Sequence, residues 1–85
     1  MMDKKEVKNI GMDMKALVRI GKKGINSSMI EEIDRHLEDK EILKIKVLRN
    51  NPIQDIEETS RILKEKTIGE VAEIRGKTIL MYYED

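Results

Sequence analysis

Two glycines enclose two lysines in the run Gly21-Lys22-Lys23-Gly24, whose residue types are suited to binding an anion. Glycine leaves its backbone open to close approach, and lysine adds a point charge that suits a phosphate. Between a strand and a helix, the N–H groups of such a loop and the free donors of the helix's first turn can point at one anion. The run predicts a loop that grips a phosphate backbone without reading bases. An ordinary turn with solvated lysines is the alternative.

Other basic residues are expected near this loop. Arg19 precedes it, Lys44 and Lys46 alternate along a later strand, and Lys77 belongs to a turn near the C-terminus. Side chains two apart on a strand share a face, so Lys44 and Lys46 predict a basic strand face. Lys77 either extends this surface or is a solvated turn lysine. The candidate nucleic-acid contacts are therefore Arg19, Gly21, Lys22, Lys23, Gly24, Lys44, Lys46 and Lys77.

The sequence shows no pattern of residues that is typical of a catalytic or metal-binding site. There is no cysteine, which excludes disulfides and thiolate metal sites. His36 is the one histidine, and Glu57 and Glu58 are adjacent on an expected helix, so they do not face each other. Tyr82 and Tyr83 are the only aromatic residues, and consecutive strand positions point to opposite faces. We therefore expect no enzyme, no metal or cofactor, no small-molecule substrate, and no aromatic platform for stacking bases.

The charge is balanced in total but not along the chain. Formal net charge is zero, which is unusual for a nucleic-acid-binding protein. Residues 1–24 carry a net charge of +4 and the remainder −4, so one end can attract phosphate. No apolar stretch approaches the length of a spanning helix, so no membrane partner is expected. Absence of cysteine fits a reducing compartment, and we expect a cytoplasmic protein.

Turn-forming and cap residues divide the sequence into seven predicted elements, in the order α-β-α-β-α-β-β. Helical spacing and cap residues predict three helices, at residues 3–10, from Asn26 to about residue 39, and from Asn51-Pro52 to about residue 66. Alternating or β-branched runs predict strands at residues 16–20, 42–48, 71–75 and 78–83. Strands joined by helices and a closing hairpin predict one α/β domain, residues 1–85, with α+β-like two-layer character. The domain is expected to contain a four-stranded mixed sheet, and the sequence leaves the order of its strands open.

Three segments, in this order, resemble the CRM domain (chloroplast RNA splicing and ribosome maturation), including the stand-alone YhbY-like proteins. They are residues 18–25, VRIGKKGI, residues 41–47, EILKIKV, and residues 74–82, IRGKTILMY. The resemblance spans about residues 4 to 83. It implies a fold similar to the C-terminal domain of bacterial translation initiation factor three, with Gly21 to Gly24 as a principal RNA contact. Family members often have proline where this chain has Ala16 and histidine where it has Lys40; neither departure touches the loop.

The resemblance implies an RNA-binding protein that assists ribosome assembly, with ribosomal RNA or a large-subunit precursor as partner. Two other classes stay open from the residues. A DNA- or RNA-coating chromatin protein of the Alba kind has similar size and topology, and it would prefer duplex DNA. A protein-interaction adaptor would present the basic face to an acidic partner, as the neutral total charge allows. The sequence does not identify the RNA, the oligomeric state or any need for a protein partner.

Overall fold

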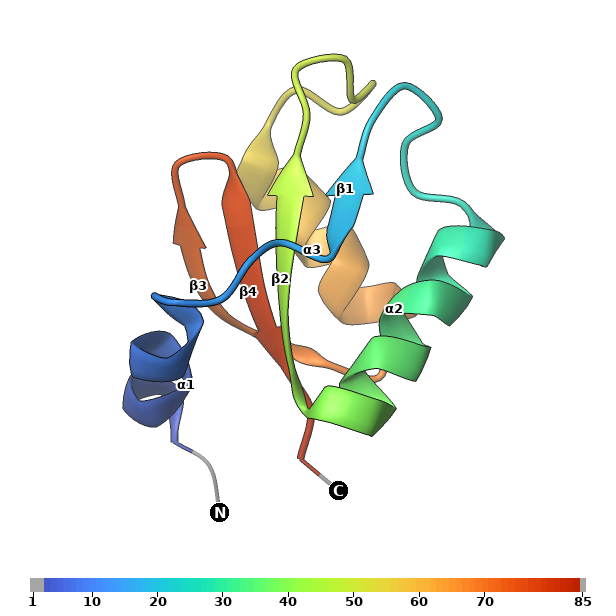
Figure 1. The fold of residues 1–85 in the computed structure, drawn as a ribbon. Helices are drawn as coiled ribbons and strands as arrows, with labels where there is room; N and C mark the ends of the chain where they lie inside the picture. Colours follow the sequence, from blue (N-terminus) through green and yellow to red (C-terminus); the bar gives the residue numbers. More distant parts are fainter. Residues whose placement is uncertain (1–2, 85) are drawn as a thin grey trace.

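The computed structural model describes residues 3–84, so Met1, Met2 and Asp85 of the predicted domain lie outside the described residues. Seven elements follow one another in the predicted order (Figure 1). They are α1 (Lys4–Gly11), β1 (Val18–Ile20), α2 (Ser27–Lys40), β2 (Ile42–Val47), α3 (Ile56–Lys66), β3 (Glu70–Arg75) and β4 (Thr78–Tyr82). Within residues 3–84, every helix is too short or too polar to cross a membrane.

The four strands form one mixed sheet in the order β1-β2-β4-β3. β1 and β2 are parallel, whereas β4 runs antiparallel to both of its neighbours, β2 and β3. The carboxyl ends of β1 and β2 therefore lie at the same edge of the sheet as the β3–β4 hairpin (Figure 1). This topology confirms the predicted four-stranded mixed sheet and supplies the strand order that the sequence left open.

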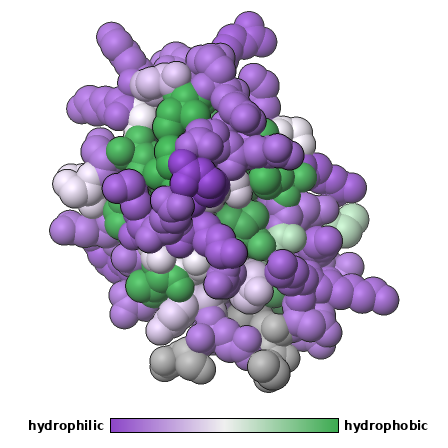
Figure 2. All heavy atoms as spheres, turned by 180° about the vertical axis from the view of Figure 1, so that it is seen from behind, coloured by the Kyte–Doolittle hydropathy of each residue, from purple (hydrophilic) through white to green (hydrophobic). Residues whose placement is uncertain are grey.

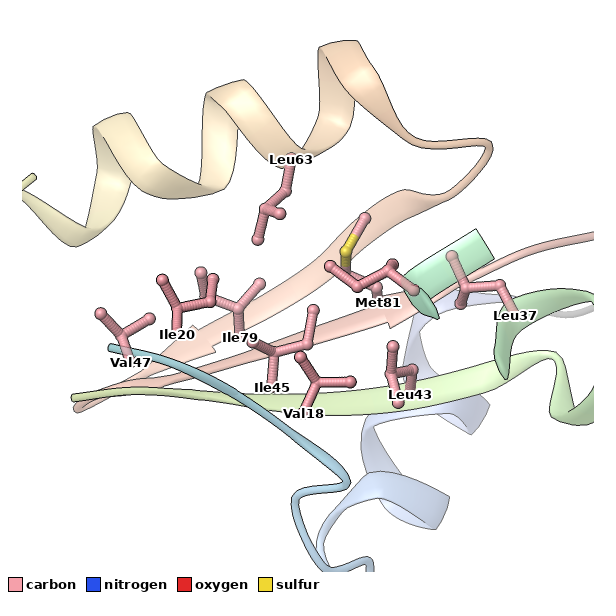
Figure 3. Packing of buried hydrophobic residues seen from close by; sticks show 10 residues of the cluster. Val18, Ile20, Leu37, Leu43, Ile45, Val47, Leu63, Ile79 and Met81 are labelled. Carbon is pink, nitrogen blue, oxygen red and sulfur yellow. The ribbon is translucent and has the colours of Figure 1, made fainter. Parts of the chain in front are cut away.

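The main hydrophobic core lies between the sheet and the helices α2 and α3. Leu37 of α2 and Leu63 of α3 are fully buried against side chains that project from one face of the sheet (Figure 3). Helix spacing places these leucines on the inner faces, and the two-residue period of the strands supplies the opposing layer. That layer consists of Val18, Ile20, Leu43, Ile45, Val47, Ile79 and Met81.

Helix α1 packs on the opposite face of the sheet. Val7 is fully buried in a smaller cluster with Ile42, Ala72 and Leu80. At Gly11 the backbone passes so close to the sheet that an added Cβ would lie 2.5 Å from Leu80 Cδ2. α1 thus adds a partial third layer and leaves part of this face uncovered. Figure 2 shows the opposite side of the molecule, where α2 and α3 lie. Hydrophilic side chains cover most of this surface, and apolar ones form small, separate patches.

The predicted start of the third helix at Asn51-Pro52 is wrong. α3 begins at Ile56, and Asp55 is its N-cap, accepting a hydrogen bond from Glu57 N. Asn51 is buried instead, and its side-chain amide donates to Ile53 O at 2.9 Å and to Thr59 Oγ1 at 3.3 Å. Pro52 therefore belongs to a loop stabilised by a buried side chain. The first strand is also shorter than predicted, with only Val18–Ile20 forming the ladder.

Candidate nucleic-acid interface

The loop from Gly21 to Gly24 forms a tight turn between β1 and α2. Gly24 N donates to Gly21 O at 2.9 Å, and Lys22 and Lys23 lie exposed at the turn between them. Gly24 is buried and has a φ of +65°, a conformation that costs any residue with a Cβ roughly 1–2 kcal/mol. The turn itself thus favours glycine at this second position, and the two lysine side chains project from its backbone.

Helix α2 starts three residues after this turn. Asn26 is its N-cap, and its Oδ1 accepts from Met29 N at 2.9 Å. The first turn of α2 contains no acidic residue that would repel an anion. Because the Asn26 side chain already occupies one of the free donors of the first turn, the charge of this loop comes chiefly from Lys22 and Lys23.

The loop between β2 and α3 lies directly against the turn. A Cβ added at Gly21 would lie 3.3 Å from Asn50 Oδ1, and one added at Gly24 would lie 3.5 Å from Pro52 Cδ. The hydrogen bonds of the buried Asn51 side chain fix this second loop from inside. The two loops therefore support each other, and the exposed Arg49 of the second loop shares an edge with Lys22 and Lys23.

The β3–β4 hairpin completes this edge. Its Lys77 carbonyl accepts a hydrogen bond from Val47 N at 2.7 Å, which ties the hairpin to the end of β2. Lys77 is exposed, and Gly76, at a φ of +57°, has open space around its Cβ position. We define the loop edge as the three adjacent connections at the upper end of the sheet in Figure 1, residues 21–24, 48–51 and 75–77. Its exposed cations are Lys22, Lys23, Arg49, Arg75 and Lys77.

A row of cations crosses the sheet next to the loop edge. Arg19 pairs in register with Lys46, Lys46 with Thr78, and Thr78 with Arg75, so one residue from each strand forms the row. Residues paired in register project from the same face, and neighbouring strands are about 4.8 Å apart. Arg19, Lys46 and Arg75 are all exposed. We call these four residues the sheet row; they lie on the face opposite α2 and α3.

Lys44 has a different environment from Lys46. Its Nζ is part-buried and donates to Gly11 O at 3.1 Å and to Met14 O at 3.3 Å. Lys44 lies where the end of α1 covers the sheet, so its ammonium binds carbonyls that follow the helix rather than extending into solvent. The sequence placed both lysines on one face, and the register agrees, but only the Lys46 ammonium is exposed. A contact between Lys44 and RNA stays an untested prediction.

The cations of the loop edge and sheet row have no ion pair within the part of the chain that the structure describes. Arg61 on α3 provides a contrast. Its guanidinium binds Glu58 and lies 2.6 Å from Glu65 Oε1, and the hydrogen bonds from Arg61 lower the pKa of Glu58. The basic groups of the loop edge and sheet row thus remain available to an external anion, whereas Arg61 is neutralised within its own helix.

Sequence reasoning missed Arg49 and Arg75. Arg75 could have been identified from its position beside the hairpin turn at Gly76-Lys77, which places it next to Lys77. Identifying Arg49 required the strand order, because this residue lies at the loop edge only through the parallel pairing of β1 with β2. Among residues 3–84 there is no cluster of three or more histidine or acidic residues arranged to hold a metal ion.

The fold is that of an α+β domain, with a glycine-bounded basic loop between its first strand and second helix. The CRS1 / YhbY (CRM) domain matches residues 2–83, and the chain belongs to this family.

Two proteins resemble this chain, one by its sequence and one by its solved structure. The chain is 31% identical over 68 residues to "Probable RNA-binding protein YqeI" of Bacillus subtilis (strain 168), an alignment covering 80% of this chain and 70% of that protein. The solution structure of the hypothetical protein SAV1595 from Staphylococcus aureus superposes with a TM-score of 0.80 at 35% sequence identity. That match covers 96% of this chain and 84% of SAV1595, so the similarity extends over nearly the whole fold.

Proposed function

We propose that this protein binds RNA, with the loop edge and the sheet row as its contact surface. The observation that carries the proposal is a concentration of exposed cations on three adjacent connections and one row of the sheet. None of these cations has an ion-pair partner among residues 3–84. Membership of the CRS1 / YhbY (CRM) family and the similarity to a protein named for RNA binding support the same conclusion.

The division of roles within the surface follows from its geometry. Lys22 and Lys23 supply charge from a turn that the positive φ of Gly24 makes possible, and the partly exposed Gly21 leaves its backbone open to the RNA. Arg19, Lys46 and Lys77 continue the charge across the sheet and along its edge. These contacts address phosphates, so this part of the surface binds a shape and a charge rather than a sequence. No catalytic step is part of the proposal.

The resemblance to stand-alone CRM proteins extends the proposal to ribosome assembly in the cytoplasm. The partner would be ribosomal RNA, in the form of a precursor of the large subunit. A structured ribosomal RNA is rich in closely spaced phosphates, which suits a surface with several cations and no aromatic platform.

The proposal is tested by measuring dissociation constants for a structured large-subunit RNA fragment and a DNA duplex of equal charge, at one salt concentration. We expect the RNA to bind more tightly. Tighter binding to the DNA duplex would replace the proposal with a chromatin-coating function, and no binding to either would favour a protein-interaction adaptor. Co-sedimentation of the protein with large-subunit precursors, rather than with mature subunits, tests the ribosomal part separately.

A further inference from the structure

A pocket opens beside the loop edge, between the β2–α3 loop and the β3–β4 hairpin. Leu48 and Ile53 line it from the loop, and Gly76 and Lys77 line it from the hairpin. Its volume is about 170 Å³. Binding pockets for drug-sized molecules occupy roughly 300–1,000 Å³, so this smaller pocket suits a single flat group such as a nucleobase.

The lining combines an apolar wall with a cationic rim. Ile53 is half-buried, yet it lies outside both hydrophobic clusters of the described residues, so its side chain is available to a ligand. Arg49 and Lys77 are exposed at the rim. An arginine guanidinium is planar and stacks on bases, which an ammonium does not. Arg49 can thus do what the two tyrosines cannot, because Tyr82 and Tyr83 lie at the other end of β4.

Gln54 adds a fixed polar group to the same pocket. Its Nε2 donates to Asn51 O at 2.8 Å, and Asn51 is itself buried. This bond orients the amide, and no donor within residues 3–84 is bonded to the carbonyl oxygen of Gln54. That oxygen is an acceptor suited to an exocyclic amino group, such as the 4-amino group of cytosine, which uracil lacks.

We propose that this pocket receives one unpaired base of the bound RNA, stacked between Arg49 and Ile53 with Gln54 as the polar contact. Lys77 then binds the phosphate beside that nucleotide, and Gly76 leaves the hairpin backbone open to it. The inference rests on the proposed RNA binding and adds a specificity to it. The loop edge binds backbone, and the pocket selects RNA with an unstacked nucleotide next to a structured region.

The test compares two RNAs that share one stem and carry equal numbers of phosphates, one fully paired and one ending in a short cytidine tail. We expect the wild type to bind the tailed RNA about tenfold more tightly, the effect of stacking one base. Ile53→Ala and Gln54→Leu should each reduce that preference to about twofold or less and leave the affinity for the paired RNA unchanged. Ile68→Ala, an exposed isoleucine at the opposite end of the sheet, is the matched control.

The outcomes separate the two proposals. Equal binding of the paired and tailed RNAs by the wild type overturns the pocket, while RNA binding stands. Binding of neither RNA overturns the proposed function itself. A uridine tail that binds as tightly as a cytidine tail overturns the role of Gln54. Gln54→Leu changes an exposed position and provides a second test if Ile53→Ala does not fold, and a ¹⁵N spectrum of each variant establishes which are folded.

Discussion

Arg19 and Lys46 lie directly opposite each other across the parallel pair of β1 and β2, and both side chains are exposed. Two like charges in this position repel each other, which costs stability in the free protein. The same register continues through Thr78 to Arg75, so a row with three cations crosses the sheet. We interpret this row as a binding site for a polyanion, because an external phosphate relieves the repulsion between the cations when it binds.

Lys46→Met and Lys44→Met form a matched pair that separates binding from stability. Lys46→Met removes an exposed cation, and we expect weaker RNA binding with a salt dependence about 0.7 to 0.9 lower in log–log slope. Lys44→Met removes two hydrogen bonds to backbone carbonyls, and we expect a loss of about 1–2 kcal/mol in the free energy of unfolding. Urea denaturation and a binding series in salt measure both quantities. An unchanged stability for Lys44→Met would contradict the assignment.

Arg49→Ala tests the residue that the sequence did not reveal. We expect a several-fold loss of affinity for structured RNA, since the side chain is exposed on the loop edge and has no ion pair among the described residues. Arg61→Ala removes the same charge from α3, where the guanidinium is bound to Glu58 and Glu65, and should leave affinity unchanged. Fluorescence anisotropy with one labelled RNA compares the two variants. Equal losses for both would mean that only net charge matters.

Asn51 and Thr59 are expected to be energetically coupled. Asn51→Ala leaves buried backbone and hydroxyl groups without their partner and should cost about 1–3 kcal/mol in the free energy of unfolding. Thr59→Val removes the hydroxyl that accepts from Asn51, so the double variant should lose less stability than the sum of the single losses. Urea denaturation of all four proteins completes the cycle. Additive losses would show that the 3.3 Å contact contributes nothing.

Gly24→Ala is expected to destabilise the protein by about 1 kcal/mol, because alanine is strained at a φ of +65°. Gly76→Ala provides the comparison, since Gly76 also has a positive φ and no atom lies within 4 Å of its Cβ position. We expect similar losses, because Pro52 Cδ is at ordinary contact distance from an added Cβ at Gly24. Thermal or urea unfolding measures both. A stable Gly24→Ala would contradict the turn geometry of the loop.

Most of the fold was predictable because local patterns and tertiary packing agree. The alternation in residues 42–48 and the Asn26 cap mark elements whose periodicity matches the face that they bury. The start of α3 was not predictable from Asn51-Pro52, because the buried partner of Asn51 is Thr59, eight residues away. A cap signal in a sequence does not reveal whether its side chain is needed elsewhere.

The candidate site was predictable where it is local and not where it depends on strand order. Gly21 to Gly24 are consecutive, so their turn follows from the sequence. The separation of Lys44 from Lys46 depends on where α1 ends on the sheet, and strand periodicity carries no information about that position. The sheet row depends on the register of all four strands, and the order of these strands could not be predicted from the sequence.

Binding of a structured ribosomal RNA fragment over a salt series, for the wild type and for Lys22→Ala/Lys23→Ala, tests the central claim most directly. Lys4→Ala/Lys5→Ala, a second pair of consecutive exposed lysines on α1, is the matched control. We expect weaker binding by the loop variant with a slope lower by about 0.7 to 0.9 for each lost phosphate contact, and an unchanged slope for the control. If the loop variant binds with the slope and affinity of the wild type, the loop from Gly21 to Gly24 is only a turn and the account is contradicted.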